Sequence, residues 1–179
     1  VRLLIDPTSS YAQAAAMAMG RAMDDVIISA ATGTSFTGET GSTSTVLPSA
    51  QKITEGSTAG LTIAKLRTAK QTFDLNSVDP SIPRFIIVSP RQINDLLGTT
   101  EVTSSDFNTV KALANGEINS FLGFNFIVSN RLSIASSKRL CIAFAQDGIT
   151  LAVGKDVQAR IDERADKSYA TQVYYCMSI

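Results

Sequence analysis

The spacing of apolar residues predicts one long helix near the start of the chain, from Ser9 to Gly33. Apolar residues recur there every three or four positions, which is typical of one face of an α-helix. Alanine dominates the segment and favours helix because it loses no side-chain entropy. We expect a sheet to cover the apolar stripe, with Gly20 marking a close backbone approach and Gly33 a left-handed cap. The stripe comprises Tyr11, Ala15, Ala18, Met19, Ala22, Val26 and Ala30.

Shorter helices are predicted in the middle of the chain. In residues 58–76 the more apolar face comprises Ile63, Leu66, Ala69, Lys70 and Phe73. Ser89-Pro90 is a typical helix start, so residues 90–97 should form a helix that Gly98 closes. A further helix is expected from Ser105 or Asp106 to residues 115–116, where Asn-Gly ends it.

The remaining apolar runs predict strands. Residues 84–89, RFIIVS, form a continuous apolar run, which is typical of a central strand buried on both faces. Alternating residues predict a half-buried strand at 124–128 after a tight turn at Gly123. Asp147-Gly148 lies between two β-rich runs and predicts a hairpin with a type I′ turn. Shorter signals predict strands at 2–6 and 157–162, a long strand at 169–179, and an irregular hairpin or exposed loop at 34–60.

This mixture of helices and strands predicts an α+β fold, because no regular alternation of strand and helix is present. Proline pairs at residues 79–83 mark a boundary between two lobes. No apolar run approaches the ~18 residues of a membrane span, and no signal peptide is visible. The chain starts abruptly at Val1, so we expect an N-terminal part to be missing.

Composition removes several kinds of chemistry. The chain contains no histidine, which is the commonest general base and metal ligand. The 16 basic and 16 acidic residues cancel to a formal net charge of +0, so no basic surface for tight nucleic-acid binding is indicated. Cys141 and Cys176 lie in apolar runs and are expected to be buried free thiols.

No group of residues forms a convincing active site. Asp162, Glu163 and Asp166 lie among basic residues between two strands, an arrangement that favours a solvated turn or a salt-bridged subunit contact over acid/base catalysis. Asp24 and Asp25 diverge on their helix and are poor metal ligands. The Gly33–Glu39 segment has the glycine spacing of a phosphate-binding loop, but carries a glutamate where that loop needs lysine. We therefore expect no catalytic, cofactor or metal residues and no cofactor.

Residues 106–132, DFNTVKALANGEINSFLGFNFIVSNRL, resemble the major capsid proteins of tailed bacteriophages and prophages. The family's pattern is a Gly-Glu-Ile segment, a Gly-Phe pair, an apolar strand and a Ser-Asn pair. Here the four parts lie at residues 116–118, 123–124, 126–128 and 129–130. The strand-then-helix at 84–97 and the tyrosine-rich terminal strand also fit, and the resemblance covers nearly the whole chain.

This resemblance implies the tailed-phage capsid fold, with a peripheral lobe and an axial lobe that contains a mixed sheet. The peripheral lobe would span residues 1–82 with the spine helix at 9–33, and the axial lobe would span 83–155. Residues 156–179 would return to the peripheral lobe. Residues 1–6 would be the returning strand of an extended loop, most of which is absent together with the N-terminal arm.

The implied function is that of a structural subunit and not of an enzyme. Copies would form pentamers and hexamers that close into an icosahedral head around double-stranded DNA, contacted non-specifically. Scaffold, portal or decoration proteins would be further partners. The subunit would belong to the virion capsid, be assembled in the cytoplasm of the bacterial host, and not contact a membrane. The alternatives are the shell subunit of an encapsulin-like compartment and, third, a small-molecule hydrolase using Asp162, Glu163 and Asp166.

Overall fold

The computed structural model describes residues 10–54, 60–97, 120–135 and 138–179. The predicted strand at 2–6 and the predicted helix at 105–116 lie outside these residues. The chain divides into two compact units, one of Val1–Ile27 with Thr150–Ile179 and the other of Ile28–Ile149. Among the described residues, no helix has the length and apolar character needed to cross a membrane.

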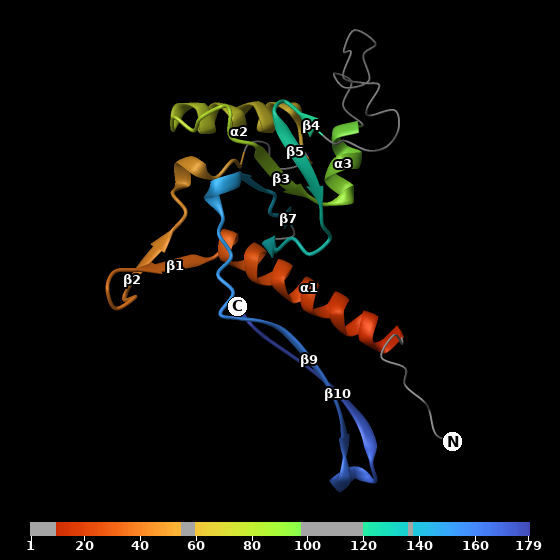
Figure 1. Cartoon of the computed structure of the whole chain (residues 1–179). Helices are drawn as coiled ribbons and strands as arrows, with labels where there is room; N and C mark the ends of the chain where they lie inside the picture. Colours follow the sequence, from red (N-terminus) through yellow and green to blue (C-terminus); the bar gives the residue numbers. More distant parts are fainter. Residues whose placement is uncertain (1–9, 55–59, 98–119, 136–137) are drawn as a thin grey trace. The chain divides into compact units, whose positions relative to one another are not determined.

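The long helix α1 spans Ser10–Thr32, as the sequence predicts (Figure 1). Gly33 does not supply the predicted left-handed cap, because its φ is not positive. A Cβ at Gly33 would lie 2.7 Å from the carbonyl oxygen of Ser29, so glycine is needed here for clearance. Conversely, a Cβ at Gly20 would meet no atom of the described residues within 4 Å, so they do not make the predicted close approach.

The apolar stripe predicted on α1 is largely uncovered in this chain. Ala18, Ala22, Val26 and Ala30 are exposed, with Val26 at 42%. The less exposed positions include Ala15, Met19, Met23, Ile27 and Ala31, and Ile28 is buried. The prediction therefore identified residues that share a helix face but was wrong about its cover, since periodicity does not show what packs on a face.

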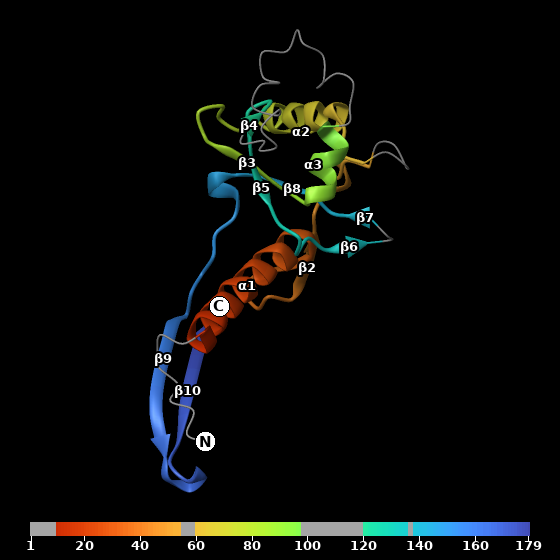
Figure 2. The same cartoon turned by 90° about the vertical axis from the view of Figure 1, so that its right-hand side faces the viewer.

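The central element of the Ile28–Ile149 unit is a four-stranded mixed sheet in the order β4-β5-β3-β8 (Figures 1 and 2). β3 (Arg84–Val88) pairs in parallel with β5 (Phe124–Val128) and antiparallel with β8 (Ile142–Ala145). β4 (Ser120–Phe121) joins β5 through a turn at Leu122 and Gly123, both with positive φ. The prediction that RFIIVS forms a central buried strand is confirmed.

Two helices cover one face of this sheet. α2 (Ile63–Leu75) contributes Leu66 and Ala69, and α3 (Pro90–Leu97) contributes Leu96, to the core around Ile86 and Val88. Both strand residues point to the same face because side chains alternate along a strand. The sheet with helices on one face agrees with the predicted α+β class. The core also contains Leu61, Phe121 and Phe124.

The start of α2 differs from the prediction in position, and the start of α3 differs in the hydrogen bonds that cap it. α2 begins five residues later than expected, where the Thr62 hydroxyl accepts a hydrogen bond from the Lys65 amide at 3.4 Å. α3 has the predicted bounds, but the buried Ser89 hydroxyl has no hydrogen-bond partner among the described residues. Instead the Gln92 side chain accepts a hydrogen bond from the Ser89 amide at 2.7 Å, which is half of a capping box.

A buried arginine links α2 to the sheet. Arg84 is 6% exposed and forms an ion pair with Asp74 at 2.8 Å. Its guanidinium also donates to the Val78 carbonyl at 3.0 Å and lies 5.4 Å from the centre of the Phe73 ring. α2 precedes the predicted lobe boundary at 82/83, and yet shares its core with β3, which follows that boundary. The limits of the lobes in an assembled shell stay a prediction.

The Asp147-Gly148 hairpin is not formed, so this prediction was wrong. Residues Gln146–Gly148 make a 3₁₀ turn, Gly148 has no positive φ, and no strand begins at residues 149–153. β8 instead pairs with β3, and the Gln146 amide donates to the Pro83 carbonyl at 3.0 Å. The partner of β8 is therefore a strand far away in the sequence and not the segment that follows the dipeptide.

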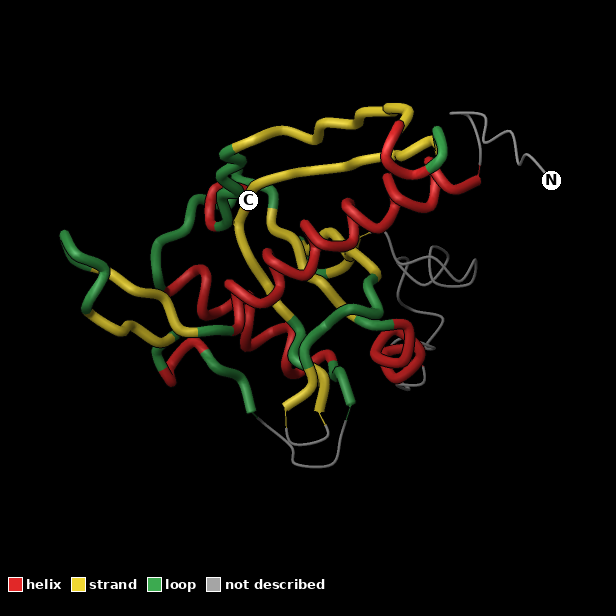
Figure 3. Tube along the Cα trace, turned by 90° about the horizontal axis from the view of Figure 1, so that it is seen from below, coloured by secondary structure: helices red, strands yellow, loops and turns green. Residues whose placement is uncertain are grey.

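Three two-stranded ribbons complete the described fold. β1 (Thr34–Thr37) and β2 (Thr43–Val46) confirm the predicted hairpin in the 34–60 segment, followed by a 3₁₀ turn at Ser49–Gln51. β6 (Ile134–Ala135) pairs with β7 (Lys138–Arg139). In the Val1–Ile27 and Thr150–Ile179 unit, β9 (Lys155–Arg164) pairs antiparallel with β10 (Ala170–Ser178) (Figure 3). The predicted strands near 157–162 and 169–179 are confirmed.

Candidate functional site

The acidic residues predicted near Asp162 do not form a site. Arg164 donates two hydrogen bonds to the carboxylate of Asp166, and this contact holds the pKa of Asp166 below its usual value. Asp162 and Glu163 are consecutive on β9, so their side chains point to opposite faces of the ribbon. Within the described part of the chain, no three His, Cys, Asp or Glu residues gather as metal ligands. The arrangement is an ion-paired turn, in which Arg164 precedes the Ala165–Lys167 3₁₀ segment that contains Asp166.

The other candidates from the sequence lie apart from one another. Asp24 is exposed and Asp25 half-buried on α1. Glu39 is exposed in the turn between β1 and β2, where a hairpin and not a strand-to-helix loop is formed. Cys141 and Cys176 are free thiols that are half-buried, less than the sequence indicated. Burial raises the pKa of Cys141 to about 11, slightly offset by the charge of Lys65, so its thiol stays protonated near neutral pH.

The β1–β2 hairpin has two chemically different faces. The register pairs Phe36 with Ser44 and Val46 with Thr34, and side chains alternate along each strand, so Phe36 and Val46 lie diagonally across one face, which we call the apolar face and which also carries the two small hydroxyl residues. The other side carries only hydroxyls, where Ser35 donates to the Thr45 carbonyl at 3.0 Å and the Thr37 and Thr45 hydroxyls are 3.2 Å apart. Phe36 is 68% exposed and Val46 58%. The apolar face therefore lies open to solvent in the single chain.

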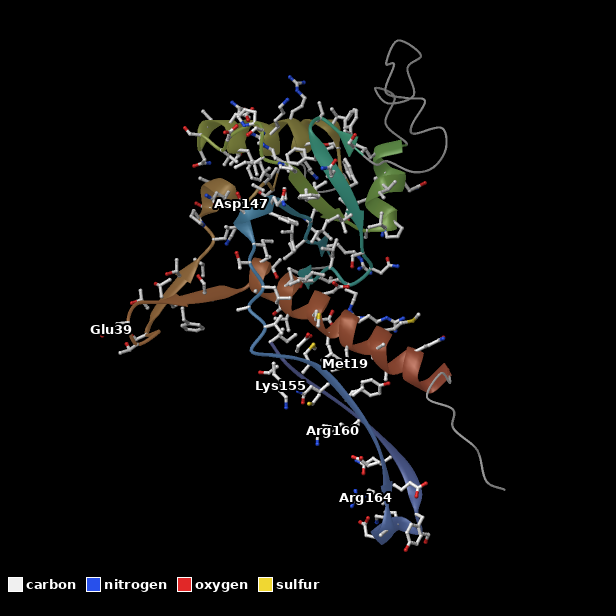
Figure 4. All side chains as sticks on the ribbon, in the orientation of Figure 1. Met19, Glu39, Asp147, Lys155, Arg160 and Arg164 are labelled. Carbon is white, nitrogen blue, oxygen red and sulfur yellow. The ribbon has the colours of Figure 1, made fainter. Side chains whose placement is uncertain are left out.

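The β9–β10 ribbon is two-faced as well. Its register places Arg160 opposite Tyr174 and Asp162 opposite Gln172 on a polar face. Alternation places Ala159 with Tyr175 on the other face. Tyr174 is half exposed. Figure 4 shows Arg160 and Arg164 along this ribbon.

An open groove of about 720 Å³ runs along the outer face of α2. Arg67 and Lys70 supply two cations to it, while Leu75 and Leu122 supply apolar surface. Leu75 is 76% exposed, the highest value among the large apolar side chains of the described residues. Asp74 also lines the groove, but its carboxylate is paired with Arg84. Sequence reasoning missed this groove, because Leu122 reaches it from a turn that is far from α2 in the sequence.

Comparison with known proteins gives these surfaces a context. The family model of the phage capsid protein matches residues 1–179. No curated protein matches the chain. A solved structure, the capsid of the Cyanophage P-SCSP1u, is similar with a TM-score of 0.55 and 19% sequence identity. The match covers 96% of this chain and 61% of that chain, so this chain spans less than two thirds of its length. At this identity the likeness shows a common fold.

Proposed function

The chain belongs to the phage capsid protein family, and we propose that it is the repeating subunit of an icosahedral bacteriophage head. The observation that carries this proposal is the family match over residues 1–179, and the similar fold of a cyanophage capsid supports it. Family and fold indicate a structural protein. In this proposal the copies associate with one another, and no residue of the chain needs to carry out a reaction.

The association we propose is into pentamers and hexamers that close into a shell around double-stranded DNA. Such rings need heterologous contacts, in which one surface of a copy meets a different surface of the next. The chain offers suitable surfaces in the uncovered faces of α1 and the β1–β2 hairpin. A net charge of +0 gives little long-range repulsion between copies and fits weak, non-specific contact with DNA.

We assign the parts of the capsid fold as follows. α1 is the spine helix of the peripheral lobe, and the four-stranded sheet forms the axial lobe around the five- and six-fold axes. The β9–β10 ribbon returns to the peripheral lobe. Placing α2 with the axial lobe is supported by the core that it shares with β3 and β5. Scaffold, portal or decoration proteins would bind the outer or inner surface of the completed rings.

The place of action we propose is the virion capsid, after assembly in the cytoplasm of the bacterial host. The same fold could serve as the shell of an encapsulin-like compartment, which holds enzymes in place of a genome. A hydrolase using Asp162, Glu163 and Asp166 has less support, because Asp166 is ion-paired and Asp162 and Glu163 face opposite ways. The contents of the particle distinguish the first two functions.

The experiment that tests the proposal is electron microscopy of the full-length protein, with particle mass from light scattering. We expect hollow closed particles whose mass corresponds to many copies. Particles that take up DNA support the phage head, whereas particles that hold only a co-produced enzyme support the compartment. A small uniform oligomer at high concentration, even with a scaffold protein co-expressed, would overturn the shell altogether.

A further inference from the structure

Two surfaces of the Ile28–Ile149 unit expose apolar side chains to solvent. The first is the apolar face of the β1–β2 hairpin, formed by Phe36 and Val46, with Leu47 directly after β2. An isolated two-stranded hairpin is marginally stable, so this face needs a partner. The second is the groove along α2, where Leu75 and Leu122 offer apolar surface. The groove of about 720 Å³ is large enough to receive an aromatic side chain.

The two surfaces also carry opposite charges. Glu39 is the only charged residue between Val26 and Gln51, and it lies at the tip of the hairpin (Figure 4). Arg67 and Lys70 line the groove and form no ion pair within the described part of the chain. The one carboxylate that lines the groove, Asp74, is already paired with Arg84 at 2.8 Å. The groove therefore presents two free cations to the single anion of the hairpin.

The hairpin does not fill the groove of its own chain, because Phe36 is 68% exposed and Leu75 is 76% exposed. We infer that the β1–β2 hairpin of one copy docks in the α2 groove of a neighbouring copy, with Phe36 against Leu75 and Glu39 beside Arg67 and Lys70. This inference rests on the proposed self-assembly. The two surfaces are different parts of the chain, so the contact is heterologous and repeats from copy to copy around a ring.

The first test is cross-linking between two singly labelled forms of the full-length protein. Both lack the native thiols through Cys141→Ala and Cys176→Ala; one form carries Phe36→Cys and the other Leu75→Cys. A short bis-maleimide should join them into a dimer only when the two are mixed, so the link is between copies. Ile134→Cys, at an apolar site that is 64% exposed, replaces Phe36→Cys as the control and should give at least fivefold less dimer. Equal yields from both pairs would overturn the inference.

The second test reverses the charges. We expect Glu39→Lys to raise the protein concentration needed for half-maximal assembly about two- to fivefold, the range for one exposed ion pair. The double change Arg67→Glu with Lys70→Glu should have a similar effect, and combining all three changes should restore assembly. Asp147→Lys is the matched control, because Asp147 is also an exposed carboxylate but lies in the 3₁₀ turn after β8 (Figure 4).

The outcomes separate this contact from the proposed function. If the unchanged protein forms no particles, the shell proposal fails. If the unchanged protein and the Asp147→Lys variant assemble, and Glu39→Lys assembles at the same concentration without cross-linking between residues 36 and 75, the docking contact is wrong while the shell stands. Higher salt should also weaken the difference between Glu39→Lys and the unchanged protein, since salt screens exposed pairs.

Discussion

Substitutions at two phenylalanines can test the folding of this subunit independently of its assembly. Phe124 on β5 is fully buried at 0% exposure, and its ring lies 5.9 Å from that of Phe73 on α2. Phe36 on β1 is 68% exposed. The same change, to alanine, should therefore lower the free energy of unfolding at one position and impair contacts between copies at the other.

The size of the effect at Phe124 follows from its burial. Burying such a side chain is worth about 2–3 kcal/mol, and the cavity left behind raises the cost of Phe124→Ala to about 3–5 kcal/mol. With a denaturant slope of about 2 kcal/mol per molar urea, the unfolding midpoint of the unassembled subunit should fall by about 2 M. Phe36→Ala should change the free energy of unfolding by less than about 0.5 kcal/mol.

The assay is urea unfolding of the unassembled subunit, followed by circular dichroism, with light scattering of the same preparations under assembly conditions. Phe124→Leu is the conservative control and should lose less than about 1.5 kcal/mol, because most of the volume is kept. We expect Phe36→Ala to unfold like the unchanged protein but to scatter less light. Equal midpoints for Phe124→Ala and Phe36→Ala would refute the core that we describe.

Three further substitutions and one alkylation experiment test local features. Gly20→Ala should raise the free energy of unfolding by about 0.5–1 kcal/mol in a urea titration, because a Cβ there meets nothing, and a loss would show a hidden contact. Ala18→Leu should shift the same midpoint by less than about 0.5 kcal/mol, since Ala18 is exposed; a large loss would mean that the stripe is covered. Thr62→Ala should lower it by about 1 kcal/mol by removing the cap of α2, while Thr62→Ser should not. Mass spectrometry should find Cys141 unalkylated by iodoacetamide at pH 8 until the protein is unfolded. Burial raises the pKa of this thiol from its ordinary value of 9.0 to about 11 in the folded chain. The stability that the neutral thiol contributes is therefore complete below pH 9 and is lost as the pH rises towards 11.

Local sequence signals predicted elements well where the deciding forces are local. The Ser89-Pro90 pair placed the start of α3, because serine is favoured at the N-cap and proline at the first helical position. The apolar run at 84–88 predicted a central strand, because only burial on both faces accommodates such a run. The bounds of α1 followed from its periodicity and alanine content.

The same signals failed where a distant partner decided the outcome. Asp147-Gly148 is a strong hairpin dipeptide, yet β8 pairs with β3, nearly 60 residues earlier in the sequence, and the dipeptide only ends the strand. The groove along α2 could not be predicted at all, because Leu122 and Leu75 come together only through the packing of α2 beside β4 and β5. Long-range pairing and packing are not encoded in any short window of the sequence.

In the described part of the chain, the residues that form the core and the residues that lie on uncovered faces belong to different elements. The buried core lies almost wholly in α2, α3 and the four-stranded sheet, while β1 and β2 contribute no buried residue. This hairpin carries both of its large apolar residues, Phe36 and Val46, on one face and only hydroxyl residues on the other, without a layer that would bury the apolar pair. In a protein that folds to work alone, such a face would favour aggregation. In the docking that we propose, the next copy supplies the missing layer, and the exposed apolar pair then specifies a contact between copies in place of a core.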